Sequence, residues 1–274
     1  MAGREDGAML SSLAPARRRL ALVVLAAALL SVVLVGVLVV RGREPAVTPV
    51  AQDRPGPVLL VPGYGGSTTA LKVLAATLRA QGRDVTVVAL AGDGTGDLRD
   101  QTHVLDAAAR AATLRTGAES VDVVGYSAGG VVTRLWVRDH DGDALARRVV
   151  TLGSPNHGTS VAAIAADVTP DSCPLGCQQL APDSDLLRSL NAGDETPPGP
   201  VFVSVWTTAD RVVTPPASAR LDGALDLPVQ SVCPRSRVEH GELPSDPQVQ
   251  AIVLAALGAD APAVPTVCRA VPGS

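Results

Sequence analysis

The chain has 274 residues, a length that suits one catalytic-sized domain with an appendage. Its formal net charge of −4 removes the electrostatic case for a nucleic-acid partner. Aromatic residues make up only 2% of the chain, which argues against an aromatic-lined platform for sugars or bases.

An uninterrupted apolar run at residues 20–40 follows three consecutive arginines, Arg17, Arg18 and Arg19. As a helix, the run would extend about 31 Å, enough to cross the hydrocarbon core of a bilayer. A signal-peptide core is usually shorter, about 7–15 residues, so an uncleaved signal anchor is favoured over secretion after signal cleavage. The basic cluster predicts that residues 1–19 stay cytoplasmic and that the rest of the chain is translocated. We therefore expect a single-pass protein of the cell membrane whose main domain is extracytoplasmic.

Residues 41–57 are rich in proline, alanine and polar residues, which is typical of a short linker. From residue 58 to residue 274, short apolar strands alternate with helices. This alternation predicts an α/β domain with a mostly parallel sheet of about six strands and helices on both faces. Strands are expected at residues 58–61, 84–90, 120–124, 148–152, 201–206 and 227–232. Helices are expected at residues 68–80, from Asp100 to about 114, after Ser127, at 184–190, and from Asp246 to 257.

The segment at residues 156–199 breaks this rhythm with proline, glycine and aspartate and has one short helical stretch. A long irregular insertion in a compact domain is usually a lid or a binding loop. A surface excursion closed by a disulfide is an equally good interpretation, so both stay open.

Four cysteines, Cys173, Cys177, Cys233 and Cys268, lie in the part of the chain that we expect outside the cytoplasm. An even count in an oxidising compartment predicts two disulfides, for which three connectivities exist. We favour Cys173–Cys177, because the sequence between them is typical of a turn, and Cys233–Cys268, which would pin the tail to the last strand. A zinc site is disfavoured because the spacings do not form two close pairs, so no metal is expected.

The most informative stretch is Gly125-Tyr126-Ser127-Ala128-Gly129, between an expected strand and an expected helix. A serine flanked by glycines at such a junction presents its hydroxyl on a tight, strained turn. The alternative is an ordinary turn serine, but the strand-turn-helix context makes Ser127 the candidate nucleophile.

A serine nucleophile needs a histidine base and a carboxylate that orients the base. On a sheet of this kind the chain order is serine, acid, histidine, which only His240 satisfies with room for an acid on a strand end. His103 precedes Ser127 on an expected helix, and His140 lies among acidic residues and looks solvated. His157 follows a strand and could line the site.

The acid is expected to be Asp210, because it follows the strand at residues 201–206 directly. Arg211 beside it could lower its pKa or point to solvent. Acyl transfer also needs backbone donors for the oxyanion. The N–H groups of Ala128 and Tyr64 are the candidates, one after the nucleophile and one in the glycine-rich loop that follows the first strand. The other carboxylates considered are Asp183, Asp185, Asp194, Glu195, Asp222 and Asp226.

In their joint order, these stretches resemble an α/β-hydrolase of the compact bacterial lipase/esterase kind, over residues 58–257. The resemblance implies a triad of Ser127, Asp210 and His240, oxyanion donors at Tyr64 and Ala128, and a structural or substrate-contacting His157. Many relatives have His-Gly where this chain has Pro62-Gly63, although some lipases of this fold carry Pro-Gly. The stretches are Leu60-Val61-Pro62-Gly63-Tyr64-Gly65-Gly66, Val124-Gly125-Tyr126-Ser127-Ala128-Gly129-Gly130, Leu152-Gly153-Ser154-Pro155-Asn156-His157-Gly158-Thr159, Asp210-Arg211-Val212-Val213-Thr214-Pro215, and His240 followed by Leu243.

The predicted function is cleavage of carboxyl esters through an acyl-enzyme on Ser127, without a cofactor. The substrate is expected to be a small-molecule or lipid ester, and no obligate protein partner is indicated. The same triad would serve an acyltransferase, a thioesterase or an amidase, and an inactive envelope interaction module is the remaining alternative.

Overall fold

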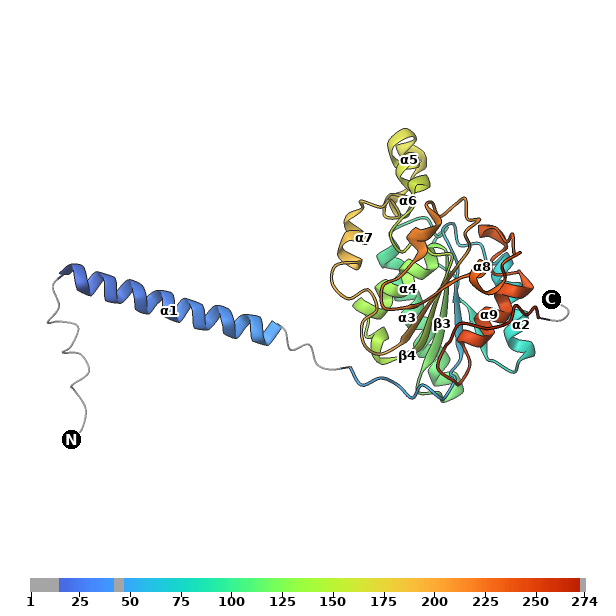
Figure 1. Ribbon diagram of the computed structural model, residues 1–274, viewed down its shortest axis with the longest axis horizontal. Helices are drawn as coiled ribbons and strands as arrows, with labels where there is room; N and C mark the ends of the chain where they lie inside the picture. Colours follow the sequence, from blue (N-terminus) through green and yellow to red (C-terminus); the bar gives the residue numbers. More distant parts are fainter. Residues whose placement is uncertain (1–14, 42–46, 272–274) are drawn as a thin grey trace. The chain divides into compact units, whose positions relative to one another are not determined.

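The computed structural model describes residues 15–41 and 47–271. The chain divides into two units, residues 1–46 and residues 47–274. The first contains helix α1 (Pro15–Arg41), and the second contains the sheet with its helices (Figure 1).

Within the part of the chain that the structure describes, no helix has the length and hydropathy required of a membrane span. The anchor predicted at residues 20–40 includes position 21 and positions 36–40, whose side chains lie outside the described residues. Residues 1–14 of the predicted cytoplasmic segment and residues 42–46 of the predicted linker also lie outside them. These assignments stay predictions.

The second unit is built on a six-stranded sheet in the order β2-β1-β3-β4-β5-β6. All neighbouring strands pair in parallel, as the alternating pattern predicted. β1 and β4 are buried along their whole length, because helices cover both faces of the sheet. The strands are β1 (Val58–Val61), β2 (Val85–Val87), β3 (Val121–Tyr126), β4 (Ala146–Leu152), β5 (Val201–Trp206) and β6 (Leu225–Pro228).

Two apolar cores lie on opposite faces of the sheet, and Figure 1 shows the helices on both sides of it. Along β1, Leu59 and Val61 belong to one core and Val58 and Leu60 to the other, as the two-residue period of a strand requires. The first core packs against α3 (Leu98–Thr116), α4 (Ala128–Asp139) and α7 (Asp185–Leu190). The second packs against α2 (Thr69–Ala80) and α9 (Pro247–Ala256).

Several expected boundaries were wrong. The strand expected at residues 84–90 spans only Val85–Val87, and the last strand begins at Leu225 and not at residue 227. α3 is capped by Asp97, whose carboxylate accepts the N–H of Arg99, and not by Asp100, which lies inside the first turn. The last strand ends at Pro228, and residues 229–232 form the short helix α8 (Val229–Val232). Proline lacks the N–H that continues a ladder and suits the start of a helix, so the apolar run changes from strand to helix there.

The insertion at residues 156–199 is more helical than its composition suggested. It contains α5 (Ser160–Val168), the 3-10 turn η2 (Pro170–Ser172), α6 (Leu175–Gln178) and α7. The remaining 3-10 turns of the domain are η1 (Gly142–Ala144), η3 (Pro216–Ala219) and η4 (His240–Glu242).

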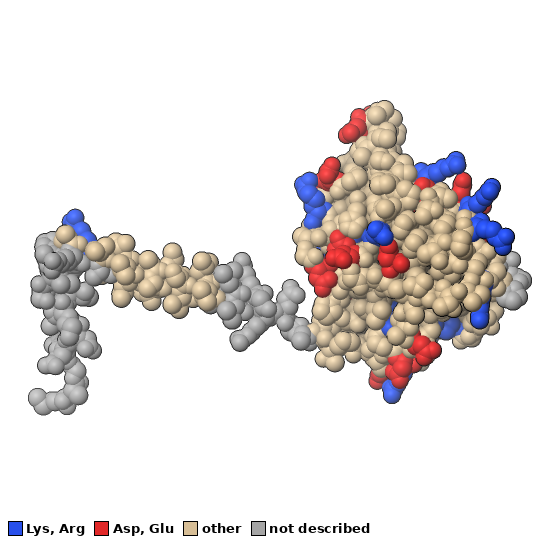
Figure 2. Space-filling model, viewed as in Figure 1, with Lys and Arg blue, Asp and Glu red and all other residues tan. Residues whose placement is uncertain are grey.

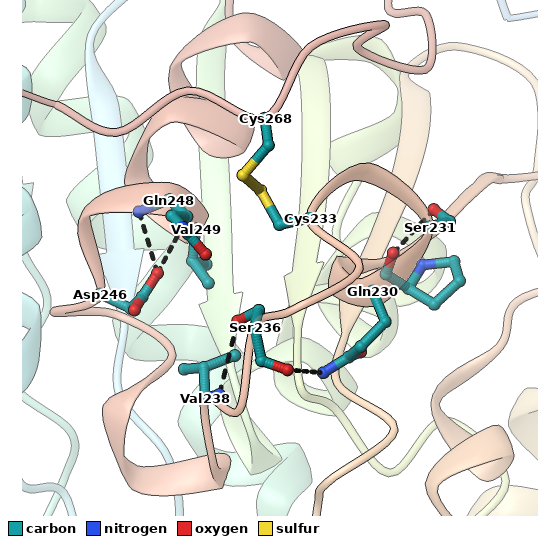
Figure 3. Close-up of a disulfide and its surroundings, with 10 residues drawn as sticks. Gln230, Ser231, Cys233, Ser236, Val238, Asp246, Gln248, Val249 and Cys268 are labelled. Atoms are coloured by element: carbon teal, nitrogen blue, oxygen red, sulfur yellow. Dashed lines mark hydrogen bonds between the residues drawn. A yellow bond between two sulfur atoms is a disulfide. The ribbon is translucent and has the colours of Figure 1, made fainter.

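Both disulfides have the pairing favoured from the sequence. Cys173–Cys177 closes a turn within the insertion, and Cys233–Cys268 ties the carboxyl-terminal tail to the segment after α8 (Figure 3). In the same region, the Asp246 carboxylate accepts the N–H groups of Gln248 and Val249 and caps α9, as predicted (Figure 3).

A buried ion cluster lies at the amino-terminal ends of the strands. Asp122 on β3 and Arg147 on β4 are both fully buried, and their side chains form two hydrogen bonds of 2.9 and 2.7 Å. Arg83 donates to the same carboxylate. Arg147 also donates to the backbone carbonyls of Gln52 and Leu257, so the cluster joins the segment before β1 and the end of α9 to the sheet.

We expect Asp122→Asn to lower the free energy of unfolding by about 3–5 kcal/mol, because Arg147 would be left as a buried charge without its counter-ion. Denaturant unfolding of the purified protein measures this. Asp84→Asn is the matched control: Asp84 pairs with Arg115 at the surface, where both side chains are about half exposed. It should cost less than about 1 kcal/mol. Equal losses of unfolding free energy in the two variants would contradict the larger contribution that we assign to the buried cluster.

Candidate active site

The backbone of Ser127 is in a conformation that residues other than glycine rarely adopt. Ser127 joins the end of β3 to the start of α4, with φ 53° and ψ −127°. This is the strained turn that the sequence predicted between strand and helix. It places the hydroxyl at the carboxyl-terminal edge of the sheet, where ligands of parallel sheets bind.

The flanking glycines are required by close backbone packing. A Cβ on Gly125 would lie 2.5 Å from the carbonyl oxygen of Gly129, and a Cβ on Gly129 would lie 2.3 Å from that of Val61. A Cβ on Gly63, in the loop after β1, would lie 2.9 Å from the Cβ of Ser127. No larger residue fits at these positions unless β1, β3 and α4 move apart.

His240 reaches Ser127 across 113 residues of sequence. Its Nε2 lies 3.0 Å from Ser127 Oγ, and its side chain is largely buried. His240 begins η4, where Glu239 and Glu242 form a reciprocal capping box that fixes the turn.

Asp210 lies on the other side of the imidazole, in the turn that follows β5. Its Oδ2 is 2.7 Å from His240 Nδ1, and its Oδ1 accepts the N–H groups of Val212 and Val213, both at 2.8 Å. A carboxylate acceptor at Nδ1 places a proton on that nitrogen and leaves the lone pair of Nε2 facing the serine. Arg211 points to solvent, one of the two orientations expected for it, since its side chain is 84% exposed.

The two candidate oxyanion donors come from the start of α4 and from the loop after β1. Ala128 is the first residue of α4, so its N–H has no acceptor within the helix. Tyr64 follows β1 in the loop whose Gly63 packs against Ser127.

A cavity of about 590 Å³ opens over Ser127 and His240. Among the described residues that line it there is no Asp, Glu, Lys or Arg, and the apolar side chains of Ala70, Val73 and Val212 form part of the wall. The other lining residues are Gly63, Tyr64, Ser67, Thr69, Tyr126, Gly241 and Ser245.

The family model of lipase class 2 matches residues 110–246, half of the chain, and the matched part includes Ser127, Asp210 and His240. The chain belongs to the class 2 lipase family. The resemblance to α/β-hydrolases of the lipase/esterase kind is thereby confirmed.

Solved structures agree on the fold of this class 2 lipase family member. Lipase B of Aspergillus fumigatus matches with a TM-score of 0.65 at 19% identity, over 80% of this chain and 56% of the Aspergillus chain. The mature form of a Bacillus licheniformis lipase matches with a TM-score of 0.55 at 22% identity, over 67% of this chain and 86% of that one. The chain therefore spans just over half of the length of the Aspergillus lipase. At identities this low, the matches show a shared fold and nothing about activity.

Tyr126 belongs to this lipase-family site, although no sequence pattern assigned it a role. Its hydroxyl donates to the backbone carbonyl of His240 at 3.1 Å, and the two rings lie 5.3 Å apart between centroids. Burial and the Asp210 carboxylate raise the pKa of Tyr126 to about 12. The only sequence signal for it was its place directly before Ser127.

The other histidines lie away from the cavity lining. His157 is exposed and pairs with the Glu195 carboxylate at 2.8 Å, so the structure does not bring this candidate substrate contact to Ser127. His140 is half-buried and lies 2.7 Å from the Thr102 hydroxyl, which corrects its expected solvated position. His103 is on α3, as expected, edge-on to His140.

Proposed function

We propose that the protein is a serine hydrolase that cleaves carboxyl esters through an acyl-enzyme on Ser127. The observation that carries this proposal is the continuous hydrogen-bonded relay from Ser127 Oγ to His240 Nε2 and from His240 Nδ1 to Asp210 Oδ2, at 3.0 and 2.7 Å. Membership of the lipase family supports an ester as the substrate.

In the proposed reaction, Ser127 Oγ attacks the ester carbonyl carbon while its proton passes to His240 Nε2. Asp210 stabilises the imidazolium that forms. The N–H groups of Ala128 and Tyr64 donate to the oxyanion of the tetrahedral intermediate. The imidazolium then protonates the leaving alcohol. Water then gives a proton to the same Nε2 and attacks the acyl-enzyme, and the imidazolium returns that proton to Ser127 Oγ as the acid is released.

The lining of the cavity favours a substrate whose acyl group, next to Ser127, is uncharged and apolar. The cavity volume of about 590 Å³ lies in the range of small-molecule sites. Burying an acidic or basic group against Ala70, Val73 and Val212 without a partner would be costly. A lipid ester fits this lining.

We further propose that the insertion at residues 156–199 contacts lipid through helix α5. Val161, Ile164 and Val168 are 46%, 61% and 72% exposed, at spacings that place them near one side of the helix. The projection that α5 forms is mostly uncharged (Figure 2). Its base adjoins the site, because Thr159 Oγ1 donates to the carbonyl of Val212, a residue of the cavity wall, at 2.6 Å.

The proposed location is the cell membrane, with the hydrolase domain extracytoplasmic. The apolar run at residues 20–40 behind three arginines supports an anchor of this orientation. Two disulfides and no free cysteine among the described residues support an oxidising compartment.

Ser127→Ala should reduce p-nitrophenyl ester hydrolysis by at least about 10³-fold, because removal of the nucleophile leaves only binding and the oxyanion donors. It should also abolish labelling by a fluorophosphonate probe. Ser231→Ala, which removes an exposed hydroxyl bonded only to the Pro228 carbonyl, should keep both. Labelling that persists in Ser127→Ala would remove Ser127 from its role.

Ile164→Ser should lower hydrolysis of emulsified long-chain triacylglycerol several-fold and leave hydrolysis of dissolved p-nitrophenyl acetate unchanged. The reason is that only the aggregated substrate presents a surface that an apolar helix face can enter. Leu114→Ser is the control, since Leu114 is 86% exposed on α3. Equal rates for Ile164→Ser and Leu114→Ser on both substrates would contradict the role given to α5.

Cell fractionation tests the location. We expect the full chain to remain in the membrane pellet after carbonate washing, because an apolar helix of this length inserts stably. Its cysteines should react with a maleimide only after reduction. Recovery of the intact chain in the soluble fraction with reactive thiols would contradict both parts of the proposed location.

A further inference from the structure

Tyr126 and Ser127 are neighbours in the chain and contact the same histidine from two sides. The Ser127 hydroxyl lies 3.0 Å from the imidazole Nε2, and the Tyr126 hydroxyl lies 3.1 Å from the carbonyl oxygen of His240. Tyr126 is the last residue of β3, a strand paired on both sides within the sheet. The end of β3 therefore positions both the nucleophile Ser127 and the Tyr126 hydroxyl that holds the His240 backbone.

The segment that carries His240 is held by packing, since Val238 and Leu243 are buried in the second apolar core, and by few hydrogen bonds from residues that end or follow the strands. Thr207 Oγ1 donates to the carbonyl of Val238 at 2.8 Å, two residues before the histidine. The capping box of Glu239 and Glu242 is internal to the turn and does not fix it to the strands. The carbonyl of His240 itself also accepts the N–H of Leu243, at a longer 3.3 Å and within the same turn.

We propose that Tyr126 is a positioning residue, whose hydroxyl holds the His240 backbone so that Nε2 stays within reach of Ser127 Oγ in both half-reactions. The inference rests on the proposed function, since it assigns Tyr126 a part in that same reaction. The imidazole must take a proton from Ser127, deliver it to the leaving alcohol and then take one from water, so a shift of its backbone affects every step. Displacements of about 1 Å at such a contact can cost as much as 10²-fold in rate.

Two further properties of Tyr126 suit this role. Its pKa of about 12 keeps the hydroxyl protonated, and so a donor, wherever a histidine base works. Its ring is tilted by 32° from the imidazole plane, so the ring supports the histidine side chain while the hydroxyl holds its backbone.

Tyr126→Phe keeps the ring and removes only the hydroxyl. Steady-state hydrolysis of a soluble p-nitrophenyl ester should show kcat about 10-fold lower with KM changed less than about twofold, because the cavity wall is retained while the base is loosened. Ser204→Ala is the matched control. It removes another buried hydroxyl that donates to a backbone carbonyl, that of Ala219 at 2.6 Å, and Ser204 does not line the cavity. Its kcat should equal that of the wild type even if its melting temperature falls as much.

A Tyr126→Phe enzyme with the kcat of the wild type would overturn the inference. So would a rise in KM at constant kcat, which would make Tyr126 a binding wall, or an equal loss of kcat in Ser204→Ala, which would make the effect general. Failure of the proposed function has a separate signature: the wild-type protein would neither hydrolyse esters nor react with a fluorophosphonate, and the inference would fall with it.

Discussion

The site depends on the left-handed backbone of Ser127, which is tolerated because its surroundings leave no alternative. Conformations of this kind cost on the order of 1–3 kcal/mol and persist only where the adjoining structure over-determines them. Here β3 enters the turn and α4 leaves it, and the backbones of Gly125 and Gly129 lie too close to their neighbours for any Cβ. The packing of these elements offsets the strain and holds the hydroxyl at the edge of the sheet.

β3 connects the buried ion cluster to this strained turn. Asp122 near its amino-terminal end is fully buried in the ion cluster with Arg147, and Tyr126 at its other end contacts the histidine that faces the nucleophile. Only four residues lie between Asp122 and Ser127, so the chain has little conformational freedom between the cluster and the site. The buried ion pair fixes the amino-terminal end of β3, and the candidate nucleophile follows its carboxyl-terminal end. This is the end at which parallel sheets bind their ligands.

The candidate triad could be located from sequence because the rule behind it needs no knowledge of contacts. Ser127, Asp210 and His240 each follow a strand or come after the last one, and the carboxyl ends of parallel strands meet at one edge. The sheet and the disulfide pairing followed from equally local patterns. Helix starts were harder, since two acidic residues, Asp97 and Asp100, compete for the same cap. Side-chain partners far apart in sequence, such as Tyr126 with His240 or His157 with Glu195, could not be predicted, because they depend on packing that no local pattern records.

The insertion and the acid of the site form one hydrogen-bonded unit. The Asp210 carboxylate is held by the N–H of Val212, and the carbonyl of Val212 in turn accepts the hydroxyl of Thr159, the N-cap of α5. The next residue of α5, Ser160, donates its N–H to the carbonyl of Thr214 at 2.8 Å. The base of α5 is thus fixed to the segment that orients Asp210, while the end of the helix at Val168 is exposed. One short backbone segment, residues 210–214, therefore both orients the carboxylate of the site and fixes the start of the insertion's first helix.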